Sequence, residues 1–176
     1  KTYLSAFDSA NYKRILFVAH REEILYQAVE AFKNVRKSED YGLFYGKQKD
    51  KDKSMIFASV MTLAKDEYLN EAYFPNDYFE YIIIDEFHHA VTAQYKKIVN
   101  YFKPKFLLGL TATPERLDGK NIYELCDYNV PYEITLKEAI NKGILVPFHY
   151  YGIYDETDYS HLHLVKGQYN EEELTN

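Results

Sequence analysis

Short apolar runs that do not alternate with polar residues constrain the fold of this chain most strongly. Four such runs are rich in branched and aromatic side chains: Ile15–Ala19, Met55–Ser59, Tyr81–Asp85 and Phe106–Thr111. A strand has this composition when both of its faces are covered, which is typical of the parallel sheets of α/β proteins. We therefore expect these runs to form buried, parallel strands.

The segments between these runs have the spacing of amphipathic helices. After Glu22, apolar residues recur on one helical face, at Ile24, Leu25, Ala28, Val29 and Phe32. Further helices are expected to start at Thr62 and at Thr92, whereas the charged segment Gly46–Ser54 is expected to be a surface loop. Alternation of strand and helix indicates right-handed βαβ units. The predicted fold class is therefore α/β, with a mostly parallel sheet and helices on both faces.

The last part of the sequence continues this pattern less regularly. A late strand is expected within Phe148–Asp155. Asp155–Ser160 has the composition of a linker, and Asn170 with Glu173 has the spacing of a helix capping box. We expect these segments to lead out of the main domain.

The composition excludes several kinds of protein. The net charge of −6 provides no basic field over the whole molecule, so any contact with nucleic acid is expected to be local. No apolar run approaches the roughly 18 residues of a membrane span, so no membrane partner is expected. The single Cys126 cannot form an internal disulfide, which favours a reducing compartment and a cytoplasmic location.

Two acids follow directly from the most apolar run, because Asp85 ends it and Glu86 comes next. In an open parallel sheet, ligands bind beyond the carboxyl ends of the strands. An aspartate at that place can help to hold Mg²⁺ on the phosphates of ATP, and a second acid can orient or deprotonate the attacking water. The alternative is a strand that runs into a loop that happens to begin with acids.

Polar residues also follow the other predicted strands. They are His20 and Arg21 after the first run, Ser59 and Thr62 around the end of the second, and Thr111 and Thr113 around the end of the last. Thr113 could also cap a helix that has Pro114 at its first position. Because the carboxyl ends of parallel strands share one sheet edge, these residues predict a single site together with the two acids.

With these motifs the sequence resembles the first motor lobe of a superfamily-two helicase or translocase of the DEAD/DEAH type. The resemblance is to the branch shared with the motor subunits of type I and type III restriction enzymes. "DEFHH" (Asp85–His89) is similar to motif II and "TATPER" (Thr111–Arg116) to motif III, while "VAHREE" (Val18–Glu23) and "ASVMTL" (Ala58–Leu63) are similar to motifs Ia and Ib. The resemblance implies a RecA-like P-loop NTPase lobe over residues 1–154. Within it, "TLKEAINKGIL" (Thr135–Leu145) resembles the helix that precedes the crossing to the second lobe. Residues 155–176 would be a linker or tail toward a second RecA-like domain.

The resemblance also implies roles for individual residues, with ATP and Mg²⁺ as cofactors and nucleic acid, tilted toward double-stranded DNA, as the partner. The implied catalytic residues are Asp85, which would coordinate Mg²⁺, Glu86, which would activate water, and His88. The residues that would couple hydrolysis to movement are Thr111, Thr113 and His89. The residues that would lie along the nucleic acid are His20, Arg21, Ser59 and Thr62.

The first two residues, Lys1 and Thr2, gain a meaning from the resemblance. A phosphate loop reads G-x-x-x-x-G-K-[ST], and its backbone N–H groups and lysine hold the phosphates. Lys1 and Thr2 would be the last residues of such a loop and bind ATP, with Thr2 on Mg²⁺, and "TYLSAFDSA" would be the helix that follows. The glycines and the first strand of the lobe are absent from the sequence. We therefore expect the 176-residue chain alone to hydrolyse ATP poorly or not at all.

Two other functions stay open on the sequence. One is a non-catalytic nucleic-acid-binding module that keeps the shape of the motor lobe. The other is a P-loop ATPase of a different class. The "TATPER" element (Thr111–Arg116) argues against this alternative. A zinc site at Asp85, His88 and His89 is disfavoured, because adjacent histidines point apart and no second Cys/His cluster has ligand spacing.

Overall fold

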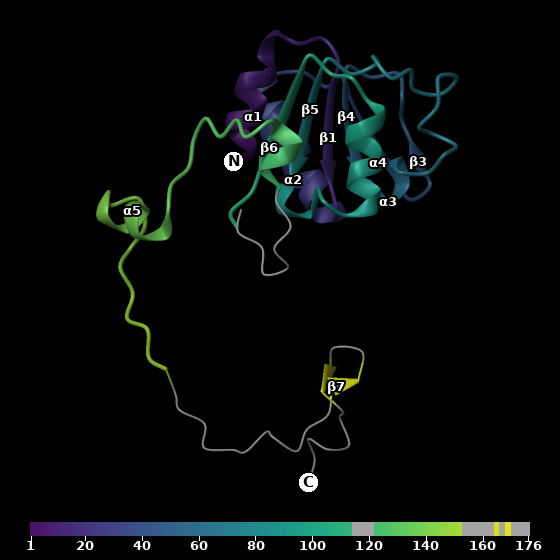
Figure 1. The fold of residues 1–176 in the computed structure, drawn as a ribbon. Helices are drawn as coiled ribbons and strands as arrows, with labels where there is room; N and C mark the ends of the chain where they lie inside the picture. Colours follow the sequence, from purple (N-terminus) through teal and green to yellow (C-terminus); the bar gives the residue numbers. More distant parts are fainter. Residues whose placement is uncertain (114–121, 153–163, 166–167, 170–176) are drawn as a thin grey trace. The chain divides into compact units, whose positions relative to one another are not determined.

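A computed structural model describes residues 1–113 and 122–152, together with the strand pairs at 164–165 and 168–169. The chain divides into two units, Lys1–Pro131 and Tyr132–Asn176, each described here by itself. Figure 1 shows the first unit as a sheet with helices on its two faces. The predicted boundary between residues 154 and 155 and the predicted cap at Asn170 lie outside the described residues.

The sheet of the first unit has the strand order β3-β2-β4-β1-β5-β6. Its strands are β1 (Ile15–Ala19), β2 (Tyr41–Tyr45), β3 (Gln48–Lys49), β4 (Met55–Ser59), β5 (Tyr81–Asp85) and β6 (Phe106–Leu110). Neighbouring strands are parallel except for β3, which runs antiparallel to β2. The four predicted strands and their parallel pairing are confirmed, and β6 ends one residue earlier than expected.

The β2–β3 hairpin corrects one expectation, because the segment Gly46–Ser54 was predicted as a loop and contains β3. Gly46 makes the turn with a positive φ of 48°, a conformation that glycine adopts readily. Its N–H donates to the hydroxyl of Thr62 at 3.2 Å. This contact ties the tip of the hairpin to the segment that follows β4.

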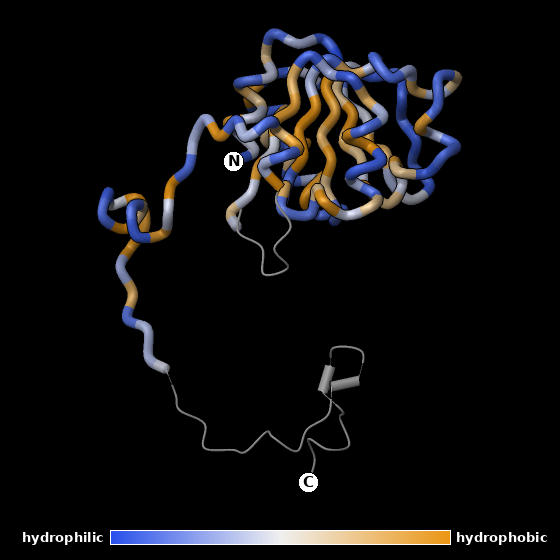
Figure 2. Tube along the Cα trace, viewed as in Figure 1, coloured by the Kyte–Doolittle hydropathy of each residue, from blue (hydrophilic) through white to orange (hydrophobic). Residues whose placement is uncertain are grey.

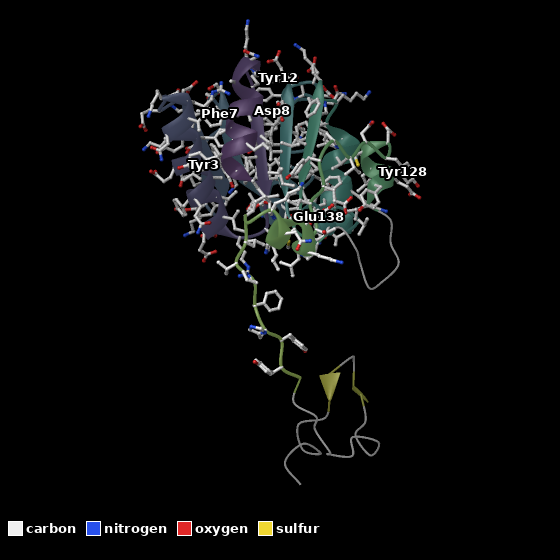
Figure 3. The ribbon with its side chains drawn as sticks, turned by 90° about the vertical axis from the view of Figure 1, so that its left-hand side faces the viewer. Tyr3, Phe7, Asp8, Tyr12, Tyr128 and Glu138 are labelled. Carbon is white, nitrogen blue, oxygen red and sulfur yellow. The ribbon has the colours of Figure 1, made fainter. Side chains whose placement is uncertain are left out.

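Helices of different lengths precede, connect and follow the strands. They are α1 (Thr2–Asp8), α2 (Glu22–Arg36), α3 (Val60–Leu63) and α4 (Ala93–Tyr101), with short 3-10 turns η1 (Ser9–Asn11), η2 (Phe87–His89) and η3 (Tyr123–Cys126). The helices expected after Glu22 and Thr92, and the helix expected after Lys1, are confirmed. Figure 3 looks onto α1, whose outer side carries Tyr3 and Phe7.

The helix predicted from Thr62 is wrong beyond Leu63, where the chain enters a series of turns. The side chain of Asn70 gives the physical reason. Its amide nitrogen donates to the carbonyls of Asp66 and Glu67, and its oxygen accepts from the N–H groups of Ala72 and Tyr73. Such side-chain bonds compete with the hydrogen bonds of a helix, which explains the turns.

Alternate side chains of each strand enter two separate cores. One core lies under α1 and α2 and includes Ala6, Ile15, Phe17, Leu25, Phe32, Phe57, Tyr81 and Ile83. The other lies under α3 and α4 and includes Leu16, Val18, Ile56, Ile82, Ile84, Phe74, Ile98 and Phe102. Figure 2 shows the strands as the most hydrophobic part of this unit. This two-sided burial explains why polar residues do not alternate in the strands.

The register of the strands sets where their carboxyl ends lie. Ala19 of β1 pairs with Ser59 of β4, and Asp85 of β5 pairs with Leu110 of β6. Val18 pairs with Ile84, which joins the two halves of the sheet. The residues that follow each of these strands are therefore neighbours along one edge.

The second unit contains α5 (Leu136–Asn141) and the antiparallel strands β7 (Leu164–Val165) and β8 (Gln168–Tyr169). The helix expected within Thr135–Leu145 is confirmed. It starts with a capping box formed by Thr135 and Glu138, and Figure 3 labels Glu138. The strand expected within Phe148–Asp155 is wrong for residues 148–152, which pair with no strand of the described chain. No described helix has the length and apolar character needed to cross a lipid bilayer.

A close approach between β6 and η2 generates a first prediction. A Cβ atom added to Gly109 would lie 2.5 to 2.8 Å from three ring carbons of Phe87, which is buried in the core. The ring cannot move away without disturbing that core, so Gly109→Ala should lower the free energy of unfolding by about 1–3 kcal/mol. Urea denaturation of the purified chain measures this change.

Gly152→Ala is the matched control, because its added Cβ would meet only Tyr150 at 3.9 Å. Combining Gly109→Ala with Phe87→Leu should recover part of the lost stability, since the smaller side chain vacates the space. A Gly109→Ala protein as stable as the unsubstituted chain would show that the ring does not depend on this glycine.

Glu80 generates a second prediction because it joins the segments that precede β1 and β6. One carboxylate oxygen accepts from Lys105 Nζ at 2.7 Å, and the other accepts from the N–H of Lys13 at 2.6 Å. The hydrogen bond from Lys105, followed by that from Lys13, lowers the pKa of Glu80 from 4.5 to about 2. The ionised form is thus favoured in the folded state, and its contribution to stability is complete above pH 4.5.

This contribution should disappear as the pH falls from about 4.5 toward 2, because the carboxylate is then protonated in the folded state as well. Glu80→Gln should therefore cost stability at pH 6, and the difference from the unsubstituted protein should shrink below pH 4.5. Urea midpoints measured across this range test the prediction. The exposed Glu133 provides the control Glu133→Gln, and an equal pH dependence for both variants would contradict it.

Candidate active site

Asp85 and Glu86 lie where β5 leaves the sheet. Asp85 is only 9% exposed, and its carboxylate accepts a hydrogen bond from the N–H of Glu86 at 3.0 Å. Glu86 has a left-handed backbone (φ 50°, ψ 53°), which turns the chain sharply into η2. This conformation costs a residue with a side chain about 1 kcal/mol. The burial of Phe87 against Gly109, directly after Glu86, helps to hold the turn.

Lys1 lies opposite the second acid. Its Nζ is 3.4 Å from Glu86 Oε1, an ion pair between groups 85 residues apart in the sequence. Thr2, the next residue, is the first residue of α1. The structure therefore brings Lys1, which is predicted to end a phosphate loop, to Glu86.

His88 joins motif II to motif III. Its Nδ1 is 3.0 Å from Thr111 Oγ1, 3.5 Å from Thr113 Oγ1 and 3.3 Å from Glu86 Oε2. The hydroxyl of Thr111 also accepts a hydrogen bond from the N–H of Thr113 at 3.1 Å. A single ring nitrogen can carry only one proton, so it cannot donate to all three oxygens at once. The helix cap predicted at Thr113 involves Pro114, which lies outside the described residues.

The other two histidines of the predicted site continue from His88. The His88 and His89 ring centroids are 4.1 Å apart, and those of His89 and His20 are 5.5 Å apart in an edge-to-face arrangement. Nδ1 of His20 is buried and has no hydrogen-bond partner within the described part of the chain. Arg21 comes next, with an exposed side chain and an extended backbone, and precedes the first residue of α2.

Ser59 and Thr62 form a local cap at the start of α3. The Ser59 hydroxyl donates to Thr62 Oγ1 at 3.0 Å and accepts from the N–H of Thr62 at 3.3 Å. Both residues are 7% exposed, whereas Met61 between them is 63% exposed. The structure thus places these two hydroxyls in a local hydrogen-bond network, and their contact with nucleic acid remains a prediction.

Sequence reasoning missed Tyr95 of α4. This residue is 3% exposed, and its hydroxyl is buried without a hydrogen-bond partner among the residues that the structure describes. Burial, and then the nearby carboxylates of Asp85 and Glu86, raise the pKa of Tyr95. The helical periodicity predicts that position 95 faces the core, but no sequence signal places its hydroxyl near the acids.

The comparison with known families matches residues 1–116 to "Type III restriction enzyme, res subunit". The chain is 29% identical over 163 residues to a 51.5 kDa protein of Lactococcus phage (isolate 7-9). This match covers 92% of this chain and 31% of the phage protein. It is 27% identical over 153 residues to the putative ATP-dependent RNA helicase L396 of Acanthamoeba polyphaga mimivirus, covering 86% of this chain and 28% of that protein.

A third relative is the type I restriction enzyme EcoAI endonuclease subunit of Escherichia coli. It is 28% identical over 176 residues, and the match covers 91% of this chain and 20% of that subunit. The chain thus spans less than a third of the length of each of these relatives.

Solved structures show the same fold. The helicase domain of Pyrococcus furiosus Hef superimposes with a TM-score of 0.56 at 18% identity, covering 70% of this chain and 29% of that one. The type ISP restriction-modification enzyme LlaGI superimposes with a TM-score of 0.58 at 17% identity, covering 81% of this chain and 17% of that one. The predicted RecA-like α/β lobe is confirmed. The chain belongs to the family of type III restriction enzyme res subunits and is a motor lobe of the superfamily-two helicase type.

Proposed function

We propose that this lobe binds and hydrolyses ATP within a longer protein that moves on nucleic acid as a helicase or translocase. One observation supports the proposal above all others. Lys1, Glu86, His88 and Thr111 form a continuous chain of contacts at one sheet edge, with successive distances of 3.4, 3.3 and 3.0 Å. Lys1 precedes α1, Glu86 follows β5, His88 lies in η2 and Thr111 follows β6, so the chain of contacts requires these four elements to be assembled.

The donor set at this edge fits Mg²⁺. Asp85 offers a carboxylate and Thr2 a hydroxyl, which are the hard oxygen ligands that Mg²⁺ prefers. No group of three or more His, Cys, Asp or Glu residues in the described chain could hold a metal. An ion at Asp85 would therefore take most of its ligands from phosphate oxygens and water, as Mg²⁺ does in nucleotide sites. When bound, it would neutralise charge on the transferred phosphoryl group.

The residues of the chain divide the remaining work. Lys1 exchanges its contact with Glu86 for the β and γ phosphate oxygens, because a phosphate carries more negative charge than one carboxylate. Glu86 is then free to orient the attacking water and to accept its proton. His88 Nδ1 can bond either to Glu86 or to the threonines of motif III. A change in the contacts of Glu86 can therefore change the hydrogen bonds of the residues after β6.

The proposed nucleic acid is double-stranded DNA. The proposed second partner is another RecA-like domain of the full-length protein. The proposed location of that protein is the cytoplasm. The family name and the EcoAI relative support DNA, whereas the mimivirus relative is named as an RNA helicase. Arg21 supplies an exposed positive charge at the same edge, where it can contact a phosphate backbone without any overall basic charge.

Glu86→Gln in the full-length protein tests the catalytic role. The amide cannot accept the proton of the water, so turnover should fall by about 10²–10⁴-fold, while the affinity for ATP should persist. Phosphate release is measured with duplex DNA, single-stranded DNA and single-stranded RNA, and ATP affinity by titration. Glu23→Gln, on an exposed acid in the first turn of α2, is the matched control.

The outcomes distinguish the proposed motor from its rivals. An unsubstituted protein that binds nucleic acid and hydrolyses no ATP would identify a non-catalytic module. Turnover stimulated by a protein partner and not by nucleic acid would identify a P-loop ATPase of another class. Normal turnover in the Glu86→Gln variant would contradict the proposal that this acid accepts the proton of the attacking water.

A further inference from the structure

Three imidazole rings lie in series along the sheet edge. His20 follows β1, His89 lies in η2 after β5, and His88 in η2 reaches the threonine that follows β6. The centroid separations of 5.5 Å and 4.1 Å are those of rings in contact. We call these three side chains the histidine row. It crosses the carboxyl ends of three adjacent strands.

The environment of His20 indicates what its ring does. Nδ1 of His20 is buried and bonds to no described protein atom, so this nitrogen is not turned toward solvent where a phosphate could reach it. The ring instead meets His89 at an angle of 66°. His20 therefore contributes a ring contact with His89 to this edge, and its contact with nucleic acid stays a prediction.

The two ends of the histidine row lie in different parts of the proposed motor. At one end, His88 Nδ1 is within 3.5 Å of oxygens from Glu86, Thr111 and Thr113. At the other end, His20 is bonded in sequence to Arg21, whose extended backbone (φ −117°, ψ 142°) sets the start of α2. The row is thus a continuous path of packed side chains from the catalytic acid to an exposed cation.

At the His88 end, one ring nitrogen lies within reach of alternative partners. Nδ1 can bond to Glu86 or to the threonines, and the ring must shift slightly to favour one of them, because one nitrogen cannot serve all three oxygens. Contact between neighbouring rings links the position of each ring to that of the next. In the coupling proposed below, a change in the partner of His88 shifts His89, and through it His20.

We propose that His20 is a positioning residue that couples the catalytic acid to the nucleic-acid edge through its contact with His89. The inference rests on the proposed function, since it concerns how nucleic acid stimulates that ATPase. Loss of the His20 ring should uncouple ATP hydrolysis from nucleic-acid binding. Loss of a direct contact with nucleic acid should instead weaken the binding itself. Coupling energies of this kind correspond to about 5–150-fold.

The test uses the full-length protein and compares His20→Ala, His20→Leu and His20→Phe. Phenylalanine keeps a flat ring against His89, leucine keeps apolar volume without the ring, and alanine removes both. For each variant we measure the ratio of nucleic-acid-stimulated to basal turnover, the Kd for nucleic acid, and the melting temperature. His149→Ala, on an exposed histidine of the second unit, is the control and should change none of these.

We expect His20→Ala and His20→Leu to lower the stimulation ratio at least fivefold with a Kd within twofold of the unsubstituted protein, and His20→Phe to retain most of the ratio. If the alanine variant does not fold, the leucine variant carries the comparison. A raised Kd in all three variants would overturn the inference in favour of direct contact. An unchanged ratio in His20→Leu, or a phenylalanine variant as uncoupled as leucine, would also overturn it.

These outcomes are separable from failure of the proposed function. An unsubstituted protein without nucleic-acid-stimulated turnover contradicts the motor and the coupling together. A stimulated unsubstituted protein with an equally stimulated His20→Leu variant contradicts the coupling alone.

Discussion

The parallel pairing of β5 with β1 on one side and β6 on the other is the constraint on which the rest of the structure depends. Five consecutive residue pairs join β5 to β6, and the pairing of Val18 with Ile84 fixes β1 beside them. A shift of one residue would move every buried side chain to the opposite face. The same register brings the residues after all three strands to one edge, so the stability of the core and the assembly of the site have a single cause.

Most of the sheet could be predicted because its signal is local. Apolar runs without alternation identify β1, β4, β5 and β6, since strands covered on both faces need apolar side chains at every position. The hairpin strand Gln48–Lys49 could not be predicted, because lysines and aspartates surround it and its pairing depends on Gly46 and Thr62. The helix expected after Leu63 failed for a related reason, since the hydrogen bonds of Asn70 outweigh the periodicity.

The candidate site could be predicted as a set of residues but not as a set of contacts. The position of each motif after a strand indicates that Asp85, Glu86 and Thr111 share an edge. The edge-to-face contact of His20 with His89 needs the relative rotation of two loops, which no spacing encodes. The same holds for Tyr95, whose position in α4 predicts burial but not a hydroxyl near the acids. The contacts between side chains from different strands are therefore the feature of the site that the sequence does not predict.

The left-handed backbone at Glu86 has a consequence for how related sequences should diverge. Glycine and asparagine adopt this conformation with little or no strain, so a lobe under selection for folding alone would favour them at this position by about 1 kcal/mol. The proposed role of its carboxylate in ATP hydrolysis is a reason to keep glutamate at this position. Descendants that have abandoned ATP turnover should therefore drift toward glycine or asparagine at this one residue, and become more resistant to unfolding as they do.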